Sequence, residues 1–225
     1  MKPEWAPEGE YISRREYHSR ALTQAVEDFS GHELIAPGGK RSWRIKNPSH
    51  GNHWAEIVVM GGTSAITVWG DIELCCFAYC SGTKSPEGVV RWMSTANVDY
   101  AREKAAIGSG FDMYGYDESV ARWDLYSHYE DAVRYLDEDA DCYPKGDAEY
   151  FKKEWKHAIR RALNRTYEKE AMHAGLLEDL SDVESDAWEW VYGVGRVVST
   201  RVLYALAAIK RLDQILTERG VLPVC

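Results

Sequence analysis

At 225 residues, of which 45% are hydrophobic, the chain is long and apolar enough to bury a sizeable core, which excludes a disordered protein. Its formal net charge of −9 argues against direct binding to nucleic acid, because contacts with phosphates need a surplus of Lys and Arg. The N-terminus has no apolar signal segment, the most apolar run is too short to cross a bilayer, and the number of cysteines is odd. We therefore expect a cytoplasmic protein that makes no contact with a membrane.

The first part of the chain is predicted to form one helix and a small sheet. S13-R-R-E16 has the pattern of a capping box and begins a helix that we expect to extend to about Phe29. Runs rich in β-branched and aromatic residues then predict about four strands within residues 41–80, at 42–46, 54–60, 65–69 and 72–80. Gly70-Asp71 suits a two-residue hairpin loop, and the short connections predict an antiparallel β-meander.

From residue 85 onward the pattern becomes helical. Ser85 and Asn97 are candidate N-caps of two short helices. Apolar residues that recur every three or four positions predict longer helices at 120–136 and 147–166. A second capping box, S181-D-V-E184, predicts the start of another helix, and the apolar segment 197–219 predicts a central buried helix.

Strands that precede helices indicate an α+β fold, with a small antiparallel sheet and a predominantly helical C-terminal half packed on one face or end of it. We expect a single domain over residues 1–225. Two docked lobes are the alternative, with the N-terminal helix and the sheet in residues 1–112 and the remaining helices in residues 113–225.

Three cysteines lie within six residues, at Cys75, Cys76 and Cys80. On a strand, adjacent side chains point to opposite faces, so Cys75 and Cys76 cannot share a metal ion. Cys76 and Cys80 would lie about 13 Å apart, several times the length of a Zn–S bond. We therefore interpret this segment as a core strand, and we predict no metal site and no cofactor.

An enzyme would need a catalytic group, and the strongest candidate is Asp71, which follows a strand beside a glycine. His50 and His53 lie in a neighbouring loop and could complete a metal-dependent or hydrolytic site. The sequence contains no P-loop, dinucleotide, nucleophile-elbow or zinc-protease motif. We therefore predict that the protein is not an enzyme and keep this site as an alternative.

The strongest functional signal is the separation of charge along the second half of the chain. From Asp117 to Glu149 there are eleven acidic and three basic residues, and Glu178 to Glu189 adds six acidic residues and no basic one. The helix between them is basic, so the faces either neutralise one another or leave an exposed acidic ridge that competes for a basic nucleic-acid channel. The candidate partner-binding residues are Asp137, Glu138, Asp139, Asp141, Glu178, Asp179, Asp182 and Asp186.

The segments I66-T-V-W-G-D71 and R91-W-M-S-T-A-N-V-D-Y-A-R-E-K104 resemble a group of phage- and prophage-encoded accessory proteins of unknown function. The apolar stretch A205-L-A-A-I-K-R-L212 is similar to the C-termini of these proteins. The resemblance implies a phage accessory gene, and such genes often encode inhibitors of bacterial defence, anti-CRISPR proteins among them. It carries no site residue over to this chain.

We therefore hypothesise a phage-encoded inhibitor that binds a host protein or a ribonucleoprotein defence complex in the cytoplasm of the bacterial host. Binding would use the acidic helical surface to block a basic surface of the partner. One alternative is the enzyme around Asp71, His50 and His53. Another is a protein that sequesters a small ligand, such as a nucleotide, in a pocket between sheet and helices. Homo-oligomer formation stays open.

Overall fold

The computed structural model describes residues 6–7, 12–37, 40–49, 53–60, 65–71, 74–78, 85–106, 114–138 and 147–223. It has an α+β fold, as the sequence predicts, with an antiparallel sheet followed by a mostly helical part. None of the helices in these ranges is both long enough and apolar enough to span a membrane.

Two compact units make up the chain. We call Met1–Arg14 with Tyr116–Val197 the helical unit, and Arg15–Gly115 with Val198–Cys225 the sheet unit. The helical unit is thus largely an insertion into the sequence of the sheet unit. For this reason the two units do not coincide with residues 1–112 and 113–225.

The sheet unit is built on an antiparallel meander in which each strand pairs with the next along the chain, in the order β1-β2-β3-β4-β5-β6. Its strands are β1 (Glu33–Pro37), β2 (Ser42–Lys46), β3 (Trp54–Met60), β4 (Ala65–Gly70), β5 (Cys75–Ala78) and β6 (Ala105–Ala106). Its helices are α1 (Arg14–Phe29), α2 (Pro86–Ser94), α3 (Val98–Lys104) and α8 (Thr200–Glu218). The first residue of α1 belongs to the helical unit.

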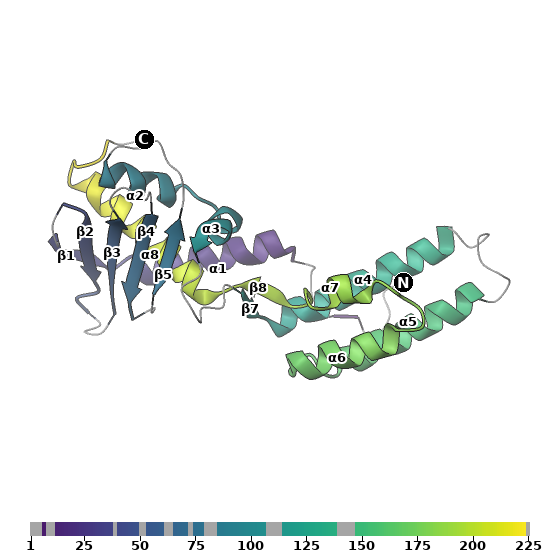
Figure 1. The fold of residues 1–225 in the computed structure, drawn as a ribbon. Helices are drawn as coiled ribbons and strands as arrows, with labels where there is room; N and C mark the ends of the chain where they lie inside the picture. Colours follow the sequence, from purple (N-terminus) through teal and green to yellow (C-terminus); the bar gives the residue numbers. More distant parts are fainter. Residues whose placement is uncertain are drawn as a thin grey trace. The chain divides into compact units, whose positions relative to one another are not determined.

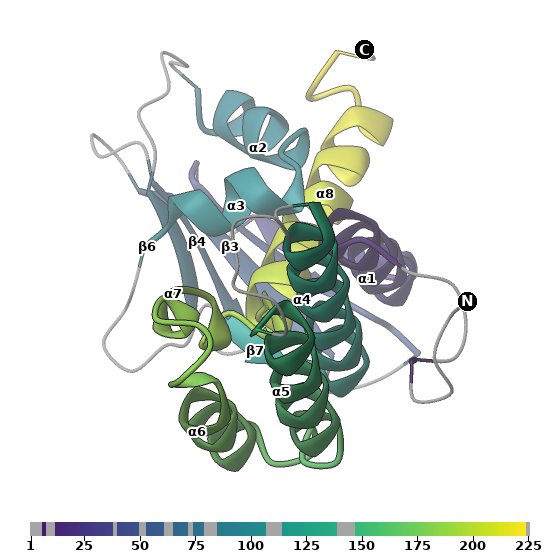
Figure 2. The same ribbon diagram turned by 90° about the vertical axis from the view of Figure 1, so that its right-hand side faces the viewer.

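The helices of the sheet unit cover one face of the sheet (Figures 1 and 2). Residues on β2 and β3 alternate between buried and more exposed, because neighbouring side chains on a strand point to opposite faces. Ile45, Ile57 and Val68 lie on the covered face and are fully buried. The prediction of a small antiparallel sheet with helices packed on one face is confirmed.

α8 is the central helix of this unit and contacts α2, α3 and strands β1 to β5. Residues 205–209 are all buried, so the helix is enclosed around its whole circumference there. The predicted central buried helix is therefore confirmed. Ser85 and Asn97 cap α2 and α3 as expected, through side chains that accept the backbone N–H groups of Gly88 and Tyr100.

The cysteine segment is confirmed as a core strand in its described part, Cys75–Ala78. Cys75 is buried, and Cys76, on the opposite face, is half-buried. Burial raises the pKa of the Cys75 thiol to about 12, so this group stays protonated and unreactive at neutral pH. Cys80 lies outside the described residues.

The expected two-residue hairpin at Gly70-Asp71 is wrong. β4 and β5 last pair at Val68 and Cys75, so the connection is longer than two residues. Gly70 instead continues β4 beside Ala55, with φ of 145°, and a Cβ atom there would lie 2.4 Å from the Trp54 carbonyl oxygen. Glycine is needed for this close approach.

The helical unit contains α4 (Glu118–Glu138), α5 (Asp147–Leu163), α6 (Lys169–Leu180) and α7 (Ala187–Val191). α5 contacts both α4 and α6, and α6 contacts α7 (Figure 1). The long helices predicted at 120–136 and 147–166 correspond to α4 and α5. β7 (Tyr114–Tyr116) and β8 (Arg196–Val198) form a separate two-stranded sheet where the chain passes between the units.

The helix start predicted at Ser181 is wrong. Ser181 is the C-cap of α6, and its hydroxyl donates to the carbonyl oxygen of Glu178 at 2.8 Å. The amide of Glu184 donates back to the carbonyl oxygen of Leu180, so the chain turns instead of starting a helix. The next helix begins only at Ala187.

Candidate functional site

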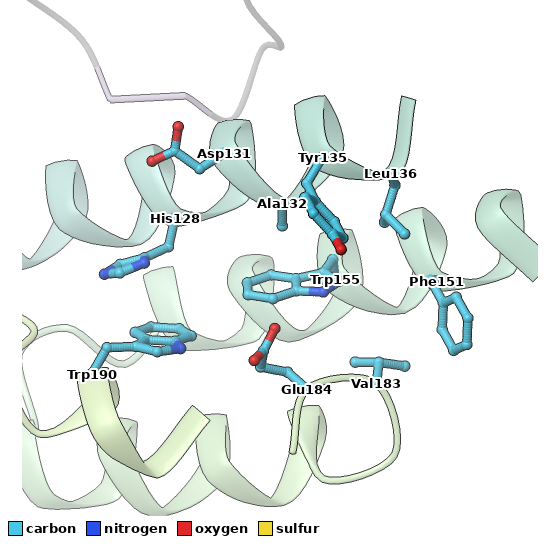
Figure 3. A pocket seen from close by; sticks show the side chains of 10 residues that line it. All are labelled: His128, Asp131, Ala132, Tyr135, Leu136, Phe151, Trp155, Val183, Glu184 and Trp190. Atoms are coloured by element: carbon cyan, nitrogen blue, oxygen red, sulfur yellow. The ribbon is translucent and has the colours of Figure 1, made fainter. Parts of the chain in front are cut away.

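The helical unit contains an open pocket of about 410 Å³ (Figure 3). Three parts of the chain form it: α4, the start and middle of α5, and the segment from the end of α6 into α7. The lining residues are His128, Asp131, Ala132, Tyr135, Leu136, Phe151, Trp155, Val183, Glu184 and Trp190. A concave site of this size with aromatic walls and few polar groups has the general features of a ligand pocket.

Helical spacing explains how the pocket walls form. His128, Asp131, Ala132, Tyr135 and Leu136 recur at intervals of three and four, which brings them to one face of α4. Phe151 and Trp155 are four residues apart on α5 and share a face for the same reason. The turn after α6 then supplies the opposite wall.

Stacked rings form the inner part of the pocket. The ring centroids of His128 and Trp190 are 4.0 Å apart, and those of Trp155 and Trp190 are 5.9 Å apart with an interplanar angle of 12°. Trp155 is 5% exposed, so its position is fixed by the core of the unit. Burial lowers the pKa of His128, which keeps its ring neutral at pH 7.

Two carboxylates belong to the pocket lining. Asp131 forms an ion pair with Arg134 at 2.6 Å on the exposed side of α4. Glu184 points toward the rings of Trp155 and Trp190 (Figure 3). Burial raises the pKa of Glu184, and within the described part of the chain no Lys or Arg pairs with it. A positive charge in the pocket would therefore stabilise its ionised form.

Four of the predicted acidic residues are next to pocket-lining residues in the sequence, although none of them lines the pocket itself. Asp137 and Glu138 directly follow Leu136 at the end of α4, and both are exposed. Asp182 and Asp186 flank Val183 and Glu184, and are also exposed. The fold thus brings together two acidic runs that lie more than forty residues apart in the sequence.

The remaining predicted residues differ in position. Glu178 and Asp179 lie on α6, where Glu178 is exposed and Asp179 is half-buried. Asp139 and Asp141 lie outside the described residues.

Some of the acidic charge is neutralised by the basic helix α5. Lys152 pairs with Asp137 at 2.5 Å and with Glu149 at 2.7 Å. Arg161 pairs with Asp179 at 2.8 Å, and the Asp179 side chain is only 14% exposed. Neutralisation within the fold therefore accounts for Asp137 and Asp179, which leaves Glu138, Glu178, Asp182 and Asp186 as the more available carboxylates.

The excess negative charge belongs to the helical unit alone. This unit holds 23 of the 36 acidic residues but 13 of the 27 basic ones, and the sheet unit holds 13 acidic and 14 basic residues. The electrostatic field of the helical unit would therefore attract positively charged molecules.

The alternative site around Asp71 is not assembled in the described residues. The Asp71 carboxylate accepts a hydrogen bond from the Trp54 amide at 2.9 Å, and the Asp71 amide donates one to the Trp54 carbonyl oxygen. Asp71 thus links the start of β3 to the end of β4. The ring of His53 contacts Phe29 and His32, and His50 lies outside the described residues. Within the described ranges, no three His, Cys, Asp or Glu side chains are arranged to hold a metal ion.

Sequence reasoning identified the charge around the pocket and missed its interior. Trp155 lies within the helix predicted at 147–166, Glu184 was assigned to the capping-box pattern at 181–184, and His128 carried no recognisable motif. The one usable signal is the pair of tryptophans at 188 and 190 inside an acidic run, since tryptophan is enriched at interfaces. No protein-family model, curated protein or solved structure matches this chain.

Proposed function

We propose that this protein is a binding protein whose helical unit recognises a positively charged polypeptide partner. The observation that carries the proposal is that exposed carboxylates lie next to the lining of the aromatic pocket on two segments: Asp182 and Asp186 flank the lining residues Val183 and Glu184, and Glu138 follows the lining residue Leu136 by two positions. Complementary charge speeds association and selects among partners, and a pocket adds contact area at the centre of such a surface.

Exposed aromatic side chains beside these carboxylates support the proposal. Tyr135 in the pocket wall and Trp188 on α7 are each 59% exposed. Tyrosine and tryptophan are enriched in protein interfaces because they combine a large apolar face with a polar tip. A patch that combines such rings with unneutralised carboxylates is suited to a basic polypeptide.

A narrower proposal makes the partner a basic surface of a bacterial defence complex, with this protein as its phage-encoded inhibitor. It rests on the sequence resemblance to phage accessory proteins and on the acidic character of the helical unit. Sequestration of a nucleotide is the weaker alternative, because Asp131 and Glu184 in the pocket lining would repel its phosphates.

Charge reversal tests the proposal. Binding of fluorescent nonapeptides of arginine or lysine to the full chain is measured by anisotropy at low and high salt. We expect Asp182→Lys/Asp186→Lys to weaken binding by about tenfold, because each reversal turns an attraction into a repulsion. Added salt should weaken binding to the wild type as well, because it screens exposed charges.

The matched control is Glu27→Lys/Glu103→Lys, which changes the net charge equally on exposed residues of the sheet unit. We expect its affinity to stay within about twofold of the wild type, since rim charges away from an interface contribute little. An equal loss of peptide affinity in both variants would mean that only the net charge matters, and it would contradict a binding surface on the helical unit. Absence of binding to either peptide would end the proposal.

A further inference from the structure

We propose that the aromatic pocket of the helical unit receives an arginine side chain of the partner, with the guanidinium against the indole of Trp190 and hydrogen-bonded to the Glu184 carboxylate. This inference rests on the proposed function, because it names the group on a basic polypeptide that the pocket selects. The pocket, the orientation of Glu184 and the stacked rings carry the argument (Figure 3).

The shape of the pocket suits a flat cation on a long stem. Trp155 and Trp190 lie nearly parallel, at 12°, and the ring of His128 stacks on Trp190, so the inner part of the pocket is built from flat ring faces. A guanidinium stacks on such a face and is attracted by the ring quadrupole when it lies within about 6 Å of the centroid. The three methylene groups of arginine would then contact the apolar side chains of Ala132 and Val183.

The charge of the pocket suits the same group. Glu184 points into the pocket, and among the described residues no basic side chain neutralises it. His128 presents a neutral ring at pH 7, because burial lowers its pKa, so it does not repel a cation. A bound guanidinium would supply the missing countercharge and make a charge-assisted hydrogen bond to Glu184.

Arginine is favoured over lysine by the chemistry of the walls. An ammonium group is compact and strongly hydrated, so leaving water to enter an aromatic pocket costs more free energy than for a guanidinium. The ammonium group of lysine also has no flat face that could stack on the indole of Trp190. The exposed carboxylates outside the pocket do not make this distinction, since they act on either charge.

The experiment follows the indole N–H signals of the full chain by ¹⁵N NMR during titration with N-acetylarginine amide. N-acetyllysine amide and the citrulline analogue, which keeps the shape of arginine without its charge, are titrated in parallel. We expect arginine to shift the Trp190 and Trp155 signals, with at least about fivefold weaker binding of lysine and none of citrulline. Trp190→Phe assigns the Trp190 signal.

Glu184→Gln is the decisive variant, because it removes the charge and keeps the size of the side chain. We expect it to weaken arginine binding by about tenfold, as for loss of a charged hydrogen-bond partner. The matched control is Glu189→Gln on α7, an exposed carboxylate outside the pocket lining, which should bind as the wild type does. Circular dichroism and the indole spectrum establish that both variants are folded.

Equal binding of arginine and lysine, or unchanged affinity in Glu184→Gln, would overturn this inference. The proposed function would stand in that case if Asp182→Lys/Asp186→Lys still weakened the binding of both nonapeptides. Stronger binding of N-trimethyllysine amide than of arginine would also overturn it and assign the pocket to a methylated ammonium group. Arginine amide binding with no nonapeptide binding would instead contradict the proposed function and leave a site for a free small cation.

Discussion

Gly195 adopts a left-handed backbone conformation at a crowded point of the helical unit. Its φ is +69°, its amide donates to the Asp124 carboxylate at 2.8 Å, and its carbonyl oxygen accepts the Asp117 amide at 3.0 Å. A Cβ atom at this position would lie 2.4 Å from the ring of Tyr116 and 2.7 Å from Ala121. We expect Gly195→Ala to lower the free energy of unfolding by about 3 kcal/mol, through backbone strain and steric overlap together.

Gly220 separates these two causes. Its φ is +70°, but no atom lies within 4 Å of the Cβ that a substitution would add. We expect Gly220→Ala to cost only about 1 kcal/mol, the strain of a left-handed conformation alone. Denaturant unfolding measures both variants, and equal losses would contradict the steric role of Tyr116 and Ala121.

His32 makes the stability of the sheet unit depend on pH. It is fully buried against the rings of Phe29 and His53. Burial, together with the neighbouring His53, lowers its pKa from 6.5 to about 4. Because the unfolded chain binds this proton more readily, stability is retained above pH 6.5 and falls as the pH drops toward 4.

We expect His32 to lower the free energy of unfolding by on the order of 2 kcal/mol between pH 7 and pH 4. Urea unfolding of the wild type and of His32→Phe measures this difference. The variant keeps a ring and removes the titrating group, so its curve should be flatter over this range. His157→Gln, which removes an exposed histidine from α5, is the control and should keep the wild-type slope. Parallel curves for the wild type and His32→Phe would contradict the role of His32.

At the level of residues, charge was predictable and the pocket interior was not. The exposure of Asp182 and Asp186 follows from the cost of burying an unpaired carboxylate. The pocket depends on His128, Trp155 and Trp190, which come from three different segments and meet only through tertiary packing. Local sequence patterns do not indicate which side chains from distant segments pack together.

Arg91 joins α2 to the central helix of the sheet unit. Its guanidinium donates to the Asp213 carboxylate at 2.6 Å, to the Thr217 hydroxyl at 2.5 Å and to the carbonyl oxygen of Pro223 at 2.9 Å. The Arg91 and Asp213 side chains are each less than one-fifth exposed. We expect Arg91→Met to lower the free energy of unfolding by about 2 kcal/mol, because it leaves a half-buried carboxylate unpaired.

A double-mutant cycle tests the attribution to this pair. Arg91→Met/Asp213→Asn should be more stable than Arg91→Met alone, since the second change removes the uncompensated charge. Chemical unfolding of the four proteins gives the coupling energy. Strictly additive losses would show that Arg91 acts through its other contacts instead.

At the level of elements, a strand or helix start was predictable where neighbouring residues alone determine it. β2 and β3 were predictable because their side chains alternate between a buried and a more exposed face. β1 was missed: its pairing is interrupted by an irregularity between Leu34 and Ala36, and Pro37 ends it. The Ser181 pattern failed because the hydrogen bond from Glu184 to Leu180 closes the preceding helix, which a capping-box pattern alone does not reveal.

At the level of the whole molecule, each unit has a core of its own. Leu176 and Trp155 belong to the core of the helical unit, and Ile57 and Leu206 to that of the sheet unit. We expect Leu176→Ala to weaken protection against hydrogen exchange in the helical unit by about 3 kcal/mol, with little change in the sheet unit. Ile57→Ala should have the reverse effect.

Hydrogen–deuterium exchange with mass spectrometry measures these effects segment by segment in the full chain. The reciprocal pair is the control, because both variants delete buried aliphatic atoms. Loss of protection in both units from either variant would indicate a single cooperative unfolding transition and contradict independent cores.

The position of α8 has a consequence for synthesis on the ribosome. Residues 15–115 are translated first, but the helix that fills their core is made only after residues 116–197. At about 5–20 residues per second, roughly 4–16 s separate the two parts of the sheet unit. Until the inserted helical segment has been made, the nascent meander lacks α8 on the face that its helices cover, so part of the apolar surface that the finished protein buries is open to chaperones during translation.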